Sequence, residues 1–208
     1  PSMHSSQNEQ DSRFYGKFAM IPVFEPSNQQ EAYDMVESAF ELSEAMKEPV
    51  LLRVVTRLAH SRAAVEVGEP KAENPLNIAK ESWVLLPAIA RRKYAELLDK
   101  QTDMLDAAEK SSYNKKEQAV GQKLGIIACG IAYNYVMENN PGEKHISVLK
   151  VSQYPLPEKA IKALAAECSE ILVAEDGQPL VEEQVRGFLG TDYKVKGRLT
   201  GHLPRTGE

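Results

Sequence analysis

The stretch that decides the fold runs Lys47-Glu-Pro-Val-Leu-Leu-Arg-Val-Val-Thr-Arg-Leu-Ala-His-Ser61. Residues 50–55 are mostly β-branched or apolar, which predicts a strand buried on both faces of a mostly parallel sheet. Polar side chains follow where this strand should leave the core, at Thr56, Arg57, His60 and Ser61. In open α/β sheets ligands bind outside the carboxyl ends of the strands, so the basic pair predicts a site for an anionic ligand. A charged cluster after a strand is also typical of a solvated loop, and both interpretations stay open.

Composition and charge limit the class of protein. The chain has 208 residues, 42% apolar and 26% charged, which suffices for a core in one large or two small domains. Its formal net charge of −5 argues against a nucleic-acid surface. Two cysteines without CxxC spacing and four scattered histidines predict neither a disulfide framework nor a metal cluster, and indicate a cytoplasmic protein. No apolar run approaches the ~20 residues of a membrane span. The chain opens on Pro1 instead of Met, which suggests a piece of a longer protein.

The first part of the chain predicts one strand-helix-strand unit. A short helix is expected from about Glu9 to Phe18, because Phe14 and Phe18 are four residues apart after a polar run. A strand at 20–25 and a helix at about 28–47, opened by a capping box of Ser27 and Gln30, lead to the strand at 50–55. This is a single βαβ unit of a parallel sheet, too little for a domain.

The second part predicts a small α/β domain after a connector. Residues 62–80 lack periodicity, and Pro87 begins a long helix to about Lys110 that is expected to bridge two domains. Strands are then expected at 124–129, 145–150, 170–174 and 192–196, and helices at about 131–138, from Pro157 and from Pro179 to Gly190. This alternation predicts a small parallel sheet covered by helices on both faces.

Several reactive side chains have ordinary structural interpretations. Cys129 and Cys168 are predicted to be small buried hydrophobes, since neither has a catalytic partner nearby in sequence. Glu175 and Asp176 lie at the ligand edge of the second sheet, but they also fit a turn and the cap of the next helix, which we favour.

The polar run from His4 to Arg13 is the strongest candidate for binding. It places ten hydrogen-bonding side chains in a row without Gly or Pro, which is unusual for a linker and suited to a polar ligand. Together with the polar end of the strand it supplies the candidate residues of a substrate or cofactor cleft: His4, Ser5, Ser6, Gln7, Asn8, Arg13, Arg57 and His60.

Blocks along the whole chain resemble one enzyme family. The blocks are Pro1-Ser-Met-His-Ser-Ser-Gln-Asn-Glu-Gln-Asp-Ser-Arg13, Ile21-Pro-Val-Phe-Glu-Pro26, Glu31-Ala-Tyr-Asp34, Thr56-Arg57 with His60-Ser61, Gly125-Ile-Ile-Ala-Cys-Gly-Ile-Ala-Tyr-Asn134, Tyr154-Pro-Leu-Pro-Glu158 and Glu182-Glu-Gln-Val-Arg186. They are similar to the alpha subunits of indolepyruvate ferredoxin oxidoreductases, within the thiamine diphosphate-dependent 2-oxoacid:ferredoxin oxidoreductases.

The resemblance implies an enzyme that oxidatively decarboxylates arylpyruvates such as indolepyruvate to aryl-acetyl-CoA and reduces ferredoxin. It implies thiamine diphosphate, magnesium and iron-sulfur clusters as cofactors, and a beta subunit, ferredoxin and coenzyme A as partners. Residues 1–61 would be the second half of a pyrimidine-binding-like domain, 62–119 a connector with the long helix, and 120–208 a transketolase C-terminal-like α/β domain. The polar run would then face the active site, with Arg57 and His60 beside it.

The chain also departs from the family pattern. The glutamate that activates the cofactor, the diphosphate motif and the iron-sulfur cysteines are expected outside these residues, and Cys129 stands where a serine or alanine is usual. We therefore expect no catalytic residue, no bound cofactor and no activity in this piece alone, and either self-association through residues 1–61 or packing of that part on the second domain. The alternative is a stand-alone α/β binding or scaffold module without catalysis.

Overall fold

The computed structural model describes residues 10–71, 84–117, 123–139, 146–190, 194–197 and 200–204. Its larger sheet has the order β3-β5-β4-β7-β8. The predicted strands are β4 (Leu124–Cys129), β5 (Ile146–Val151), β7 (Glu170–Ala174) and β8 (Lys194–Lys196), and all four run parallel. An edge strand that the sequence did not predict, β3 (Lys116–Glu117), pairs antiparallel with β5. The small parallel α/β sheet is thus confirmed, with one antiparallel addition.

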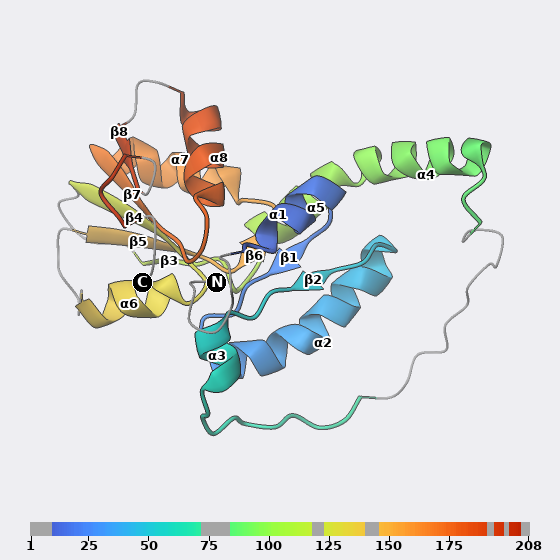
Figure 1. The fold of residues 1–208 in the computed structure, drawn as a ribbon, viewed down its shortest axis with the longest axis horizontal. Helices are drawn as coiled ribbons and strands as arrows, with labels where there is room; N and C mark the ends of the chain where they lie inside the picture. Colours follow the sequence, from blue (N-terminus) through green and yellow to red (C-terminus); the bar gives the residue numbers. More distant parts are fainter. Residues whose placement is uncertain are drawn as a thin grey trace.

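Helices cover both faces of this sheet, as predicted (Figure 1). Successive residues of β4 point to opposite faces, so Ile127 joins one core cluster and Ile126 another. The first cluster packs against α7 (Glu158–Glu167) and α8 (Leu180–Leu189), and the second against α6 (Ala132–Asn139). Burial on both faces explains why β4 and β5 are nearly continuous apolar runs in the sequence.

The first part of the chain forms the predicted βαβ unit. The strands β1 (Val23–Phe24) and β2 (Leu51–Leu52) pair in parallel around α2 (Gln29–Met46). The capping box is shifted from the prediction by one residue: Asn28 caps α2 by accepting a hydrogen bond from the backbone N–H of Glu31 at 2.9 Å, and Glu31 in turn accepts from Ser27. The first helix, α1 (Arg13–Ala19), begins four residues later than predicted.

The stretch 50–55 is not a strand buried on both faces, so that prediction was wrong. Only two residues of it are paired, Leu51 and Leu52 are half-buried, and Val54 is 43% exposed. The physical reason is that β2 is an edge strand, with β1 on one side. After Val55 the chain enters a short helix, α3 (Thr56–His60). The sequence had predicted that these polar residues follow the end of a buried strand.

The two halves share a three-stranded sheet of order β2-β1-β6. The strand β6 (Gln153–Tyr154) follows directly on β5 and pairs antiparallel with β1, so the first half packs against the second. The long connecting helix is two helices, α4 (Pro87–Asp99) and α5 (Gln101–Glu109), because the helix is interrupted at Lys100. Within the described residues no helix is both long and apolar enough to cross a membrane.

Candidate functional site

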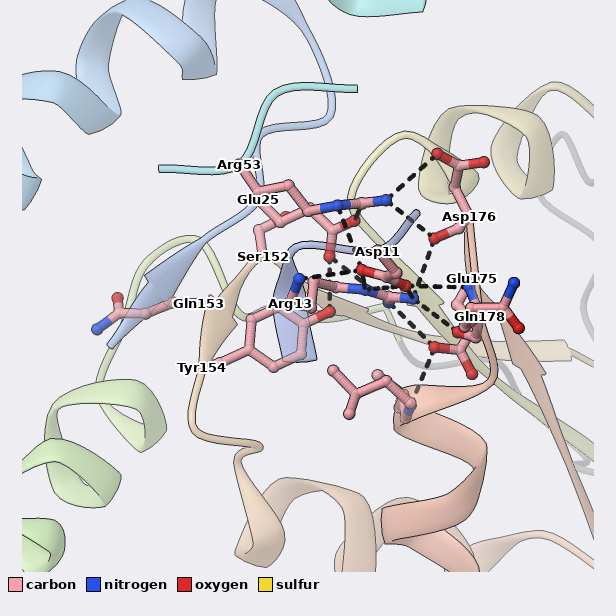
Figure 2. Close-up of polar contacts among 12 residues, drawn as sticks. Asp11, Arg13, Glu25, Arg53, Ser152, Gln153, Tyr154, Glu175, Asp176 and Gln178 are labelled. Atoms are coloured by element: carbon pink, nitrogen blue, oxygen red, sulfur yellow. Dashed lines mark hydrogen bonds and ion pairs between the residues drawn. The ribbon is translucent and has the colours of Figure 1, made fainter. Parts of the chain in front are cut away.

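The carboxyl ends of strands from both sheets converge on one buried cluster of charges. Glu25 follows β1, Arg53 follows β2, and Glu175 follows β7. We call the set the ionic cluster; its members are Asp11, Arg13, Glu25, Arg53, Tyr154, Glu175 and Asp176, and each is at most 8% exposed. Figure 2 shows these side chains pointing toward one another from separate elements.

Arg13 is the centre of the ionic cluster. Its Nη2 lies 2.5 Å from Oδ2 of Asp11 and donates hydrogen bonds to the backbone carbonyls of Asp176 at 3.0 Å and Gln178 at 2.8 Å. Its Nη1 lies 3.0 Å from Oε2 of Glu175. One guanidinium therefore fixes the start of α1 to the turn between β7 and α8.

Arg53 makes the corresponding contacts from the first sheet. It is ion-paired with Glu25 through Nη1 and donates to the backbone carbonyl of Asp176 from Nη2 at 3.2 Å. Tyr154 of β6 donates a hydrogen bond from its hydroxyl to the other oxygen of Glu25 at 2.6 Å. The ends of β1, β2, β6 and β7 are thus held together by charge-assisted hydrogen bonds.

Glu175 also caps a helix. Its two carboxylate oxygens accept hydrogen bonds from the backbone N–H groups of Val181 at 2.9 Å and Glu182 at 3.0 Å, in the first turn of α8. The favoured prediction of a turn and helix cap at Glu175 is confirmed. The same carboxylate also faces Arg13 at the ligand edge of the sheet. Glu175 therefore both caps α8 and pairs with Arg13.

Two glycines with positive φ let the backbone approach the ionic cluster. Gly130, at φ +49°, would place a Cβ 2.5 Å from the side chain of Glu25, and Gly177, at φ +97°, would place one 2.6 Å from Oδ2 of Asp11. A side chain at either position would be strained and would displace a carboxylate of the ionic cluster.

The ionic cluster holds more acidic than basic groups: four carboxylates face two guanidinium groups. Burial raises the pKa of Glu175 despite the neighbouring Arg13 and the backbone N–H donors. Burial would also raise the pKa of Asp11, but hydrogen bonds and the charge of Arg13 outweigh it and lower that pKa. The surroundings therefore favour the ionised form of Asp11 and disfavour ionisation of Glu175.

Cys129 lies beside these groups at the end of β4. Burial, followed by the negative charges of Glu175 and Glu25, raises the pKa of its thiol well above the usual range. A protonated, fully buried thiol is not a nucleophile, so the prediction that Cys129 is a small buried hydrophobe is confirmed. Most polar groups of the ionic cluster pair with one another, although Nη1 of Arg13 and both carboxylate oxygens of Asp176 are buried without a hydrogen bond. This arrangement can orient the strand ends.

A second buried charge lies at the end of β5. Lys150 is ion-paired with Glu31 of α2, and its Nζ lies 4.8 Å from the centroid of the Tyr133 ring. Burial lowers the pKa of Lys150, while the ion pair with Glu31 opposes that shift. This pair attaches the start of α2 to the second sheet.

The structure describes three of the predicted cleft residues and places them in two different settings. His4, Ser5, Ser6, Gln7 and Asn8 lie outside the described residues. Arg13 is in the ionic cluster. Arg57 and His60 are exposed on α3, where the guanidinium of Arg57 lies 5.8 Å from the ring centroid of Tyr135.

Sequence reasoning missed Glu25 and Arg53, and it included Asp11 only as one residue of the polar run. Arg53 interrupts the apolar run Val50-Leu-Leu-Arg-Val-Val55, and Glu25 directly follows the apolar residues of β1. A charge inside such a run must be paired if the run is buried, and that rule could have identified both residues.

Comparison with known proteins finds curated relatives that are similar to nearly the whole of this chain. The indolepyruvate oxidoreductase subunit IorA of Archaeoglobus fulgidus is 39% identical over 98% of this chain and 33% of its own length. The same subunit of Methanothermobacter thermautotrophicus is 37% identical over 98% of this chain and 34% of its length. That of Pyrococcus abyssi is 40% identical over 95% of this chain and 33% of its length. The chain therefore spans about a third of the length of the curated relatives it matches, and the predicted resemblance is confirmed.

A solved structure supports the fold. The 2-oxoglutarate:ferredoxin oxidoreductase from Magnetococcus marinus, with 2-oxoglutarate, coenzyme A and succinyl-CoA bound, matches 95% of this chain and 43% of its own chain with a TM-score of 0.60. At 15% sequence identity this likeness shows the fold alone. No protein-family profile matches the chain.

Proposed function

We propose that this chain acts as part of a 2-oxoacid:ferredoxin oxidoreductase that oxidatively decarboxylates arylpyruvates, indolepyruvate in particular, to aryl-acetyl-CoA with reduction of ferredoxin. The observation that carries the proposal is the similarity of nearly the whole chain to one third of the IorA subunits. The shared fold with a 2-oxoglutarate:ferredoxin oxidoreductase agrees with it. A beta subunit, ferredoxin and coenzyme A are the proposed partners, and a cytoplasmic location is part of the same proposal.

The cofactors of this reaction class do not fit the residues that the structure describes. Thiamine diphosphate with magnesium supplies the decarboxylation chemistry, and iron-sulfur clusters carry the electrons. Among the described residues no group of three or more His, Cys, Asp or Glu side chains could hold a metal ion. Both cysteines are buried thiols, and the carboxylates of the ionic cluster are engaged by Arg13 and Arg53. We therefore propose that other parts of a longer protein hold the cofactors, and that this chain alone binds no thiamine diphosphate and is inactive.

The proposed contribution of this chain is positioning. Asp11 and Arg13 are at the end of the polar run and fix that end to the turn between β7 and α8, and the earlier part of the run supplies the cleft candidates His4 to Asn8. Arg53 and Glu25 hold the ends of the first sheet against the same turn of the second. By fixing both sheets to one turn, the ionic cluster would keep the polar run in one orientation toward the cleft.

The proposed domains follow the resemblance: residues 1–61, 62–119 and 120–208. Because β1 pairs with β6, residues 1–61 pack on residues 120–208. The proposal also retains self-association of the chain, since β2 is an edge strand.

Arg57 provides the kinetic test of the proposed cleft. Its exposed guanidinium can pair with a 2-oxoacid carboxylate or a cofactor phosphate through two parallel hydrogen bonds. Arg57→Lys keeps the positive charge but loses the two parallel hydrogen bonds of the guanidinium. In the complete protein, assayed by ferredoxin reduction with indolepyruvate, it should lower kcat/KM at least about tenfold. The matched control Arg62→Lys, five residues on and also exposed, should leave it unchanged. Unaltered kinetics in Arg57→Ala would remove Arg57 from the cleft.

The alternative function, a binding or scaffold module without catalysis, makes a different prediction. It expects no indolepyruvate-dependent ferredoxin reduction by the complete protein, even with its partner subunit, thiamine diphosphate, magnesium and coenzyme A supplied. Indolepyruvate-dependent reduction under those conditions would exclude it.

A further inference from the structure

The residues that the structure describes cover the helix α4 only in part. It has 13 residues, none of which is buried, and Figure 1 shows it extending away from the body. Pro87 at its start and the contact of Lys93 with Glu96 at 3.0 Å support it locally. A helix of this length without tertiary packing is marginal in water, so a covering surface would stabilise it.

One face of α4 combines apolar and basic side chains. Tyr94 is 56% exposed and Leu98 is 45% exposed, and they lie four residues apart on the same face. Arg91 precedes Tyr94 by three residues and is exposed on that face. This face of α4, defined by Arg91, Tyr94 and Leu98, has the character of a docking surface for an acidic, apolar partner.

The helix α2 presents a face of the complementary kind. Tyr33, Val36 and Phe40 are 41%, 44% and 69% exposed and recur at helical spacing. Five acidic residues and no basic residue lie within the 18 residues of α2. Two lysines from outside α2 offset part of this charge, since Lys150 is paired with Glu31 and Lys71 contacts Glu37 and Glu41. Five carboxylates against two lysines leave α2 acidic overall.

We propose that α4 of one copy of this chain docks on α2 of a second copy, so that the chain forms a twofold-symmetric dimer through two identical α4–α2 contacts. Each copy has one α4 and one α2, so a twofold axis forms both α4–α2 contacts at once and covers both helices of each copy. In each contact Tyr94 and Leu98 would cover Val36 and Phe40, with Arg91 beside the acidic residues of α2.

The two helices of one chain do not make this contact themselves. The ion pair of Lys100 with Glu48, at 2.7 Å, lies near the end of both helices, and from there α4 and α2 diverge (Figure 1). The side chains that would pair are therefore apart within one chain, and a second copy can reach both.

Sedimentation of the 208-residue chain over about two decades of concentration tests the dimer. The wild type should pass from monomer to dimer, and Phe40→Glu or Tyr94→Glu should each raise the dimerisation Kd at least about tenfold, with far-UV circular dichroism unchanged. Tyr15→Glu is the matched control, because Tyr15 is 70% exposed on α1, outside both faces. It should leave the Kd unchanged.

Charge reversal makes the test specific for the pairing of helices. Arg91→Glu with Arg92→Glu on α4 should abolish the dimer, and so should Glu41→Lys with Glu44→Lys on α2. An equal mixture of the two double variants should restore it, because each acidic helix then meets a basic one. A monomer at every concentration, a dimer insensitive to Phe40→Glu and Tyr94→Glu, or no restoration on mixing would overturn the proposal.

Self-association through α4 and α2 uses a surface other than the edge of β2, and it does not depend on the enzymatic role. The kinetics of the complete protein test that role separately, so either proposal can fail alone.

Discussion

Replacing Arg13 by methionine should destabilise the chain more than any exposed substitution on the same helix. Methionine keeps much of the length of the side chain but removes the charge and every donor. Asp11 and Glu175 would lose the guanidinium that lies 2.5 Å and 3.0 Å from them, and the carbonyls of Asp176 and Gln178 would lose a donor.

The magnitude follows from the burial of these groups. The side chains of Arg13 and Asp11 are both 0% exposed, so water cannot replace the lost contacts. Removing one partner of a buried ion pair destabilises by about 3–5 kcal/mol, because the remaining charge is buried without compensation. For a chain of this size that corresponds to a fall in Tm of roughly 10 °C.

Denaturant unfolding of Arg13→Met and of Lys17→Met measures the difference. Lys17 is exposed on the same short helix, so its substitution controls for the loss of one positive charge and should change the free energy of unfolding by less than about 0.5 kcal/mol. Hydrogen exchange should also rise at residues 175–178, which Arg13 holds. Equal unfolding free energies for the two variants would refute the argument that Arg13 joins the two halves.

Three further predictions concern single positions. The pKa of Asp11 in the folded chain is below its ordinary value of 3.8, so ionised Asp11 stabilises the fold above pH 3.8 and this contribution is lost as the pH falls through the lowered pKa. Asp11→Asn should therefore flatten the acidic part of the curve of unfolding free energy against pH. A curve unchanged by Asp11→Asn would contradict this prediction. Gly177→Ala should destabilise by about 1–3 kcal/mol in thermal unfolding, whereas Gly187→Ala, which has open space around it, should not. Cys129 should react with a thiol reagent only on unfolding; rapid labelling of the folded chain would disprove its burial.

The second sheet was predictable because each of its strands is a short apolar run bounded by turn residues. The strands at β4, β5 and β7 match their predicted spans to within a residue, since runs such as Leu124-Gly-Ile-Ile-Ala-Cys129 are buried on both faces. The stretch 50–55 has a similar composition but lies at a sheet edge. Pattern alone does not reveal how many neighbours a strand has, and this is why that prediction failed.

The ionic cluster could not be predicted for a different reason. Its contacts join residues as far apart in the chain as Arg13 and Gln178, which are 165 positions apart. A sequence pattern identifies a charge that needs a partner, as Arg53 does, but not which of 30 acidic residues supplies it. Arg13 was predicted to be a cleft residue because it ends the polar run, and only the three-dimensional arrangement reveals what it contacts.

The most direct test of the proposed function is product formation from indolepyruvate by the complete protein with its partner subunit. With thiamine diphosphate, magnesium, coenzyme A and oxidised ferredoxin supplied, mass spectrometry should detect the aryl-acetyl-CoA thioester, and its amount should fall to background when ferredoxin or coenzyme A is omitted. The 208-residue chain alone should form none. Absence of the thioester from the cofactor-loaded complete protein would contradict the account, and so would its formation by the 208-residue chain alone.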